Sequence, residues 1–187
     1  MSEPASSPAP AVLVLDVDGV MTDGKSHYTA DGKVTKVFGP DDHDALCVLR
    51  DVLSIQFVSG DKRGFEISRA RIGRDMGFPI ELVSSVDRLA WISERWDPAS
   101  VIYMGDGIFD ARVFEGVGYA IAPRDADDDA SDAADFVTAR RGGDRAVAEA
   151  CKHIMDRFFG GAAAMLANAG NKNAAPVAGG WGHARSA

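Results

Sequence analysis

Small polar and acidic side chains follow three short apolar runs of this chain, and their types and spacing suit metal-assisted chemistry on a phosphate group. Asp16 and Asp18 come after the first run, Ser59 after the second, and Asp106 and Asp110 after a later one. Two carboxylates two positions apart on an extended segment point to the same side, which is unfavourable unless a cation or a proton lies between them. Mg²⁺ binds one or two carboxylates together with waters and substrate oxygens. We therefore expect a magnesium site with Asp16 and Asp106 as ligands.

The same residues could provide the groups that cleave a phosphate monoester. Uncatalysed cleavage is very slow, so an enzyme must neutralise the phosphoryl oxygens and hold a nucleophile in line with the leaving group. Asp16, in contact with metal and substrate, could be that nucleophile and form an aspartyl-phosphate. Asp18 is placed to protonate the leaving oxygen and later to deprotonate the attacking water. Ser59 and the backbone N–H of Gly60 could donate hydrogen bonds to the phosphoryl oxygens.

A cationic side chain is also expected near the phosphate, and two residues are candidates. Arg88 stands at the start of a predicted helix, and Lys62 lies close to Ser59 in the sequence. An arginine early in a helix is often only a surface charge, so the sequence leaves both candidates open. Because the net charge is −8, an anionic substrate needs local compensation, which a divalent cation held by carboxylates would provide.

The elements that must position these residues alternate between strands and helices. Ala11–Leu15 is a continuous apolar run of the kind buried on both faces of a parallel sheet. The pattern continues with a helix over Asp41–Leu53, a strand over Ser54–Val58, a helix over Arg63–Met76, a strand over Ile80–Val83, a helix over Val86–Trp96, a strand over Val101–Met104, strands near Tyr119–Ala122 and Phe136–Thr138, and a helix near Arg145–Phe158. This order predicts an α/β fold with a doubly wound, mostly parallel sheet, in which ligands bind at the carboxyl ends of the strands.

The length of the chain suits one α/β domain and is short for two. Asp31-Gly32 lies between the β-prone runs Ser26–Thr29 and Val34–Phe38, which predicts a hairpin inserted into the domain. The expected organisation is a disordered leader over 1–10, the folded domain over 11–159, and a flexible Ala/Gly-rich tail over 160–187 with Trp181 as its one potential anchor.

Charge and composition argue against several classes of protein. The net charge of −8 argues against nucleic-acid binding, because phosphate backbones require clustered Lys and Arg. The N-terminus lacks the basic start and long apolar run of a signal peptide, and no segment approaches the roughly 18 apolar residues that cross a bilayer. Cys47 and Cys151 lack metal-ligand spacing. We expect a cytoplasmic protein with reduced thiols, a small-molecule substrate and no membrane partner.

Two of three further polar clusters are interpreted as structural, and the third is left open. Asp41, Asp42 and His43 stand at a helix start, where acidic groups favour the helix dipole, although His43 could also be a ligand. The run Asp125–Asp129 lacks the glycine and terminal glutamate of a calcium loop and is predicted to be a solvated loop. The basic loop Arg140-Arg141-Gly142-Gly143 could face the active site or be a surface feature.

Taken together, these groups resemble the haloacid dehalogenase superfamily of phosphohydrolases, whose first motif is DxDG after an apolar strand. The runs LDVDGVMTDG, ADGK, YMGDGIFDARVFEGVGYAIAP and ADFVTARRGGDRAVAEAC are further similar to its small capless subfamily, which includes 3-deoxy-D-manno-octulosonate 8-phosphate phosphatase. The resemblance covers about residues 11–156. It implies a Rossmann-like core without a cap domain, Mg²⁺ as the cofactor, and a sugar phosphate such as 3-deoxy-D-manno-octulosonate 8-phosphate or a nonulosonate 9-phosphate as the substrate.

The resemblance also implies roles for individual residues. Asp16 would be the nucleophile, Asp18 the acid/base that offers its backbone carbonyl to the metal, Ser59 the second-motif hydroxyl, Asp106 a metal ligand and Asp110 a support for the metal shell. Members of the subfamily are typically homotetramers in which the hairpin builds the shared interface and a neighbouring subunit partly covers each active site.

Three positions depart from the subfamily pattern. Arg88 stands in place of the third-motif lysine and keeps the charge without the compact ammonium geometry. Asp61 stands where the subfamily commonly has arginine, which places an acid where a base could meet an anionic substrate. Gly107 replaces the second acid of the common GDD form and leaves a GDxxxD arrangement that the superfamily also uses.

Two other functional classes share parts of this pattern. One is a non-catalytic oligomerisation module, similar to the phosphatase-like domain attached to some acylneuraminate cytidylyltransferases, and the intact set of acids argues against it. The other is a response-regulator receiver, which also binds Mg²⁺ and phosphorylates an aspartate on a doubly wound sheet. A receiver has its phosphoacceptor on a later strand and no acid two residues after it, so the pair Asp16 and Asp18 argues against this class.

Overall fold

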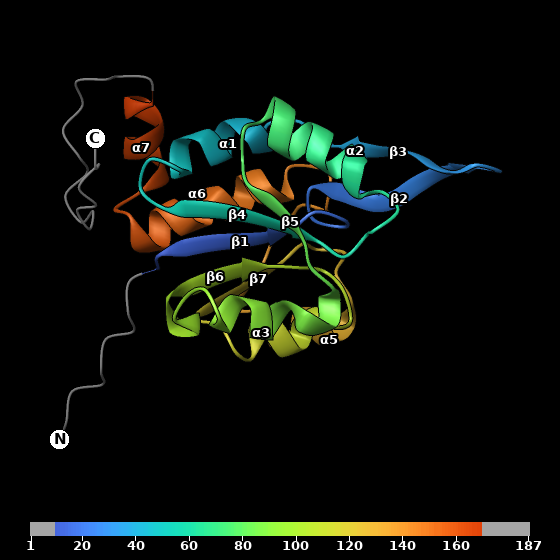
Figure 1. Ribbon diagram of the computed structural model, residues 1–187. Helices are drawn as coiled ribbons and strands as arrows, with labels where there is room; N and C mark the ends of the chain where they lie inside the picture. Colours follow the sequence, from blue (N-terminus) through green and yellow to red (C-terminus); the bar gives the residue numbers. More distant parts are fainter. Residues whose placement is uncertain (1–9, 170–187) are drawn as a thin grey trace.

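A six-stranded parallel sheet forms the centre of the protein (Figure 1). The computed structural model describes residues 10–169. The strands lie in the order β5-β4-β1-β6-β7-β8 and comprise β1 (Val12–Asp16), β4 (Ser54–Ser59), β5 (Ile80–Leu82), β6 (Val101–Met104), β7 (Tyr119–Ala122) and β8 (Phe136–Val137). The α/β fold with a parallel sheet, predicted from the alternation of strands and helices, is confirmed.

The first strand occupies the middle of the sheet. All five residues of β1 are buried, and the strand pairs with β4 on one side and β6 on the other. Asp16 is level with Val58, and Leu15 is level with Met104, so the three strands end at the same edge. The residues that follow them therefore meet at this edge, as expected for a parallel sheet.

Helices cover both faces of the sheet, and each face has its own apolar core (Figure 1). The first face carries α1 (Asp42–Leu49), α2 (Phe65–Arg69), which continues into the π-helical turn η1 (Ala70–Asp75), α6 (Ala146–Phe158) and α7 (Ala162–Asn168). The second face carries α3 (Arg88–Ser93), α4 (Asp110–Phe114) and α5 (Asp128–Ala133), with the 3₁₀ turns η2 (Ser85–Asp87) before α3 and η3 (Pro98–Ser100) after it. Within residues 10–169, no helix combines the length and apolar character needed to span a bilayer.

The predicted hairpin is present as a separate two-stranded sheet. Strands β2 (Thr22–Thr29) and β3 (Gly32–Phe38) pair antiparallel directly after the first strand, and they project from the edge where β1 ends (Figure 1). The inner part of β3 lies against α2. Within the described residues no separate cap domain is found.

Two segments differ from the sequence-based expectations. The predicted solvated loop Asp125–Asp129 runs into helix α5, because Asp127 caps the helix by accepting a hydrogen bond from the Asp129 N–H at 3.1 Å and Ala130 is buried. The predicted flexible tail begins with helix α7, whose Ala162 and Met165 pack into the core. Buried apolar contacts thus order residues up to 169. The leader up to residue 9, the rest of the tail and Trp181 lie outside the described residues.

Candidate active site

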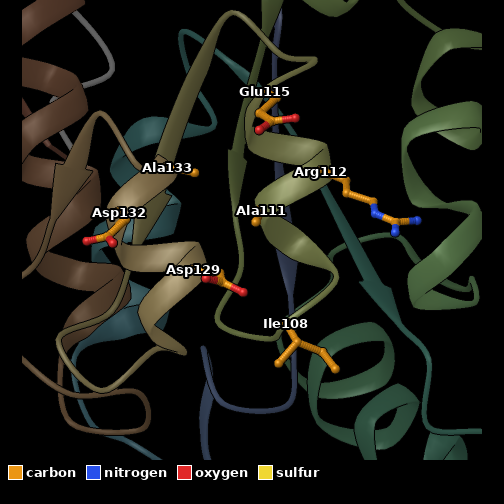
Figure 2. Close-up of a pocket in the computed structure, with 7 residues that line it drawn as sticks. All are labelled: Ile108, Ala111, Arg112, Glu115, Asp129, Asp132 and Ala133. Carbon is orange, nitrogen blue, oxygen red and sulfur yellow. The ribbon is translucent and has the colours of Figure 1, made fainter.

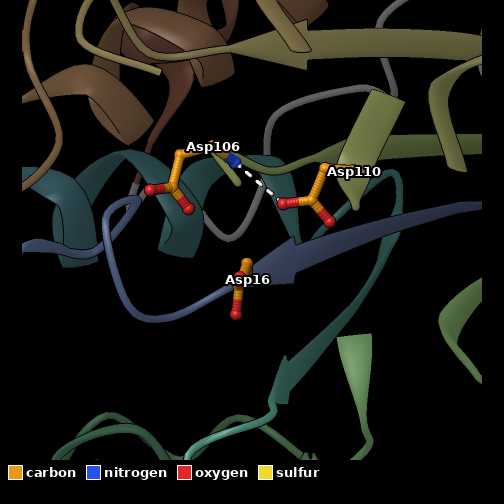
Figure 3. A group of neighbouring side chains, drawn as sticks. All are labelled: Asp16, Asp106 and Asp110. Carbon is orange, nitrogen blue, oxygen red and sulfur yellow. Dashed lines mark hydrogen bonds between the residues drawn. The ribbon is translucent and has the colours of Figure 1, made fainter. Parts of the chain in front are cut away.

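Three carboxylates meet where β1 and β6 end. Asp16 is the last residue of β1, Asp106 lies just beyond β6, and Asp110 begins α4. One side-chain oxygen of each lies within 4.8 Å of the others (Figure 3). Asp110 Oδ2 accepts hydrogen bonds from the backbone N–H groups of Asp106 and Gly107 at 3.0 and 2.9 Å, which fix the loop between the two acids. The structure thus brings together three of the residues that the sequence indicated as metal ligands.

Two glycines allow the carboxylates to approach so closely. Gly19 has a φ of +85°, and a Cβ atom on it would lie 1.8 Å from Oδ2 of Asp106. A Cβ atom on Gly105 would lie 2.5 Å from Cγ of Asp110. Side chains at these positions would displace the two acids, so glycine is required on steric grounds.

Burial raises the pKa of two of the three carboxyl groups. Burial, with Asp16 and Asp110 close by, raises the pKa of Asp106 to about 8. Burial also raises the pKa of Asp16 to about 6, although the charge of Arg88 opposes this shift. Without a cation, Asp106 therefore retains a proton near neutral pH. A divalent cation fits this set of donors, because it would replace that proton and keep the oxygen ligands ionised.

Arg88 is the cationic candidate that lies in this cluster. It is only 3% exposed, and its Nη1 donates to Asp16 Oδ2 at 2.7 Å and to Asp110 Oδ1 at 2.9 Å. The same nitrogen donates to the hydroxyl oxygen of Tyr103, which in turn donates to Asp110. The Arg88 Nε is buried and has no partner among the described residues. Lys62, the other candidate, is exposed, and within the described residues its ammonium makes no hydrogen bond or ion pair.

Asp18 and Ser59 lie beside the carboxylate cluster and contact each other. Ser59 is completely buried at the end of β4, and its hydroxyl donates to Asp18 Oδ2 at 3.0 Å. The backbone N–H of Asp61 donates to the same hydroxyl at 3.2 Å, so the turn after β4 is tied to the serine. Gly60 in that turn is exposed. The segments after β1, β4 and β6 thus present carboxyl, hydroxyl and backbone groups at one edge of the sheet.

The other polar clusters have structural contacts. Asp42 Oδ1 accepts a hydrogen bond from the Ala148 N–H at 2.8 Å, and His43 packs edge-on against Phe78. Arg140 and Arg141 are exposed, whereas the glycines after them pack closely on the backbone of the first loop: a Cβ atom on Gly142 would lie 1.8 Å from the carbonyl oxygen of Gly19.

Comparison with known proteins decides the family. No family model matches the chain. The chain is 32% identical over 149 residues to the 3-deoxy-D-manno-octulosonate 8-phosphate phosphatase KdsC of Escherichia coli (strain K12), and the match covers 77% of this chain and 78% of that protein. The chain belongs to the KdsC phosphatase family. As a KdsC-family protein it is a phosphoric monoester hydrolase of the haloacid dehalogenase type, as the sequence motifs implied.

Solved structures of the KdsC family share this fold. The cobalt-bound phosphatase from Haemophilus influenzae is 28% identical, with a TM-score of 0.69, and the match covers 79% of this chain and 88% of that one. The phosphatase from Moraxella catarrhalis, solved with magnesium, phosphate and KDO, superposes with a TM-score of 0.70 over 79% of this chain and 86% of that one. At 22% identity, the second match supports the fold alone.

One departure from the KdsC pattern is compensated by residues that sequence reasoning missed. Asp61 is paired with two lysines of the hairpin, Lys33 and Lys36, which bind the same carboxylate oxygen. Burial opposes ionisation of Asp61, but hydrogen bonds from both lysines outweigh it and lower its pKa to about 2. Lys36 also lies 2.6 Å from Asp18 Oδ1. The negative charge that replaces arginine is therefore neutralised within the protein.

A shallow cleft lies apart from the carboxylate cluster, between α4 and α5 (Figure 2). It has a volume of about 550 Å³, and it is lined by Ile108, Ala111, Arg112, Glu115, Asp129, Asp132 and Ala133. Ile108 belongs to the loop between Asp106 and Asp110, but neither of these two acids lines the cleft. Its carboxylates outnumber its one arginine, so it is poorly suited to an anionic ligand.

Proposed function

We propose that this protein is a magnesium-dependent phosphomonoesterase that hydrolyses a small sugar phosphate through an aspartyl-phosphate on Asp16. 3-Deoxy-D-manno-octulosonate 8-phosphate, the substrate in the names of the relatives, and a nonulosonate 9-phosphate are the first candidates. The observation that carries the proposal is the convergence of Asp16, Asp106 and Asp110 with the charge of Arg88 at the end of the central strand.

The carboxylate cluster is suited to holding Mg²⁺. Asp16, Asp106 and Asp110, together with the backbone carbonyl of Asp18, would supply oxygen ligands of the type that this ion prefers. The bound ion would neutralise charge that develops on the phosphoryl oxygens.

The residues of the chain divide the reaction into two steps. In the first, a carboxylate oxygen of Asp16 attacks phosphorus, the bond to the leaving oxygen breaks, and Asp18 donates a proton to that oxygen. In the second, Asp18 takes a proton from water, the water oxygen attacks phosphorus, and the carboxylate of Asp16 is released. The N–H of Gly60 would bind a phosphoryl oxygen during both steps, and Ser59 would do so when its single O–H turns from Asp18 Oδ2 to the substrate.

Arg88 would hold the nucleophile during these steps. Its Nη1 contact orients Asp16 Oδ2, and the Val17 N–H donates to Asp16 Oδ1 at 2.7 Å. A nucleophile whose two oxygens are both fixed loses little freedom on reaching the transition state. Lys62 would contact the substrate only if its exposed side chain turns towards the site.

We further propose that the enzyme is a cytoplasmic homotetramer. Free thiols on Cys47 and Cys151 are consistent with a reducing compartment. The hairpin exposes Tyr28, Val34 and Val37, which are 60%, 48% and 55% accessible and would be covered in an assembly built on β2 and β3.

Phosphate release tests the proposed function. The purified protein should release phosphate in the presence of Mg²⁺, and not with EDTA, from at least one member of a panel of acidic sugar phosphates, neutral sugar phosphates and 4-nitrophenyl phosphate. Asp16→Asn should abolish release while the melting temperature stays close to that of the parent, because the variant loses the nucleophile and not the core. Absence of release from every substrate would instead favour the non-catalytic oligomerisation module.

A further inference from the structure

The side chain of Lys36 is completely buried beside Asp18. Lys36 lies on β3 of the hairpin, and none of its side-chain surface is exposed. Its ammonium nitrogen lies 2.6 Å from Asp18 Oδ1, 2.8 Å from Asp61 Oδ2 and 2.9 Å from Ser68 Oγ. An ammonium group has three N–H donors, and this one meets three acceptors. Burial of a lysine is strongly unfavourable without such partners, so the surrounding residues are arranged to accommodate its charge.

The two oxygens of the Asp18 carboxyl group are held from different elements. Lys36, on the hairpin, contacts Oδ1, and Ser59, at the end of β4, donates to Oδ2 at 3.0 Å. The orientation of this carboxyl group is therefore set by residues far apart in the sequence. About a quarter of its surface (27%) remains exposed, so it can still meet a substrate.

Asp61 holds Lys36 in this position. Its Oδ2 binds both Lys36 and Lys33, and its Oδ1 accepts a hydrogen bond from the Gly64 N–H at 3.0 Å. Lys33 binds Asp61, but no ion pair or hydrogen bond joins it to Asp18 within the described residues. The two lysines of one strand thus share Asp61 and differ in their contact with Asp18.

We propose that Lys36 is a positioning residue that fixes the Asp18 carboxyl group for proton transfer to the leaving oxygen, and that Asp61 holds Lys36 in place for this task. The inference rests on the proposed function, in which Asp18 is the acid and base. The hairpin would thereby contribute to catalysis in its own chain, in addition to any contribution to the association of subunits.

Substrates whose leaving groups differ in basicity can distinguish a role of Lys36 in positioning Asp18 from other roles. A sugar alkoxide is strongly basic and must receive a proton as it leaves, whereas 4-nitrophenolate leaves readily without one. General acid catalysis contributes about 10²- to 10⁴-fold, so Lys36→Met should lower kcat/KM for a sugar phosphate by about 10- to 100-fold. For 4-nitrophenyl phosphate the loss should be about threefold at most. The ratio kcat/KM is the relevant quantity because it reports the first phosphoryl transfer and not the later attack by water.

Lys33→Met is the matched control. It removes an ammonium group from the same strand and the same Asp61 oxygen, and it leaves the Lys36 contact to Asp18 in place. Its kcat/KM should stay within about threefold of the parent for both substrates. A loss in Lys33→Met equal to that in Lys36→Met, with the same dependence on the leaving group, would assign the effect to the hairpin as a whole and not to the contact between Lys36 and Asp18, and would overturn the proposal.

A double-mutant cycle guards against an effect on folding. Thermal unfolding would be measured for every variant, and Lys36→Met would also be made in an Asp18→Asn background, in which the ion pair between Lys36 and residue 18 is already absent. If Lys36 acts through Asp18, the second substitution should add no more than about threefold to the loss in kcat/KM. A full additional loss in that background, with both variants folded at the assay temperature, would contradict the proposal.

Two further outcomes are distinguishable. Equal loss for both substrates with a raised KM would place Lys36 on the transferred phosphoryl group, and the positioning role would be wrong. Absence of turnover by the parent protein on every phosphate monoester would contradict the proposed function itself, before any variant is compared.

Discussion

Arg88 makes all of its contacts with the acids and with Tyr103 through one terminal nitrogen. Because Nη1 alone serves Asp16, Asp110 and the tyrosine, and Nε has no partner within the described residues, the forked geometry of the guanidinium group is not used. A compact ammonium could meet the same three acceptors. The arginine thus contributes mainly a buried positive charge.

This geometry predicts different outcomes for two substitutions of Arg88. Arg88→Met should lower kcat/KM by about 100-fold, because Asp16 loses the donor that orients its Oδ2 and a misplaced nucleophile typically has an effect of that size. Arg88→Lys should retain most of the activity, because its ammonium can serve Asp16 and Asp110. Steady-state kinetics with 4-nitrophenyl phosphate would measure both variants, and similar losses in the two would contradict this account of the contacts.

At the scale of residues, the sequence was informative about acids and uninformative about lysines. Asp16 and Asp106 could be predicted as neighbours because each follows an apolar strand of one parallel sheet, and such strands end at the same edge. The contacts of Lys33 and Lys36 with the acids could not be predicted, because the positions of these lysines depend on how the hairpin folds back over α2. In β3, Lys36 is buried while Val34 and Val37 are exposed, which inverts the usual pattern.

The loop between β1 and the hairpin depends on a glycine for two reasons that can be separated. Gly19 has a φ of +85°, and a Cβ atom on it would also collide with Asp106. Gly77 has a similar φ of +75°, but a Cβ atom there would meet nothing within 4 Å. The pair therefore separates the cost of the backbone conformation from the cost of the collision.

We expect Gly77→Ala to lower the free energy of unfolding by about 1 kcal/mol through backbone strain alone. Gly19→Ala should lower it further and also abolish Mg²⁺-dependent phosphate release, because the methyl group displaces Asp106. Urea denaturation and phosphate release would measure the two effects. Full activity of Gly19→Ala would show that Asp106 can move without loss of the site.

At the scale of elements, apolar runs were more informative than polar ones. Strands β6 and β7 have the predicted bounds because each is a short, continuously buried run. Helix α5 was missed because its sequence is mostly acidic and its stability comes from the Asp127 cap and from burial of Ala130. Helix α7 was missed because its composition is that of a linker, and only its contact with the core orders it.

At the scale of the whole molecule, the buried acids link stability to pH. The pKa values of Asp106 and Asp16, about 8 and about 6, both exceed the unfolded value of 3.8, and that of Asp42 is also about 6. Between the unfolded pKa of 3.8 and the folded pKa of each acid, the folded state therefore binds more protons than the unfolded chain. The free energy of unfolding decreases as the pH rises through this range. In EDTA, the melting temperature should decrease between about pH 6 and 8.

Mg²⁺ should reverse this dependence, because a metal ion replaces the protons and binds more tightly as the acids ionise. The increase in melting temperature on adding Mg²⁺ should be larger at pH 8 than at pH 6. Asp106→Asn removes the group with the highest pKa of the cluster and should flatten the decrease in EDTA above about pH 7. A melting temperature that does not change with pH in EDTA would contradict the assigned pKa shifts.

The exposed valines of the hairpin predict the behaviour of the assembly. If β2 and β3 form the shared interface, Val34→Asp combined with Val37→Asp should convert tetramers into smaller species, because charges would be buried without partners. Leu166→Asp, which changes an exposed apolar residue on α7, is the control and should leave the mass unchanged. Light scattering after size-exclusion chromatography would measure both. A tetramer that survives the double substitution would place the interface elsewhere.

Strand β3 carries both the lysine that contacts Asp18 and the valines available to a neighbouring chain. A neighbour bound to those valines would stiffen the strand and restrict the motion of Lys36. Catalysis would then obey mass action: on dilution below the dissociation constant of the assembly, turnover per chain would decrease although every active site remains chemically complete. Crowded and dilute preparations of the same enzyme would differ in specific activity for this reason alone.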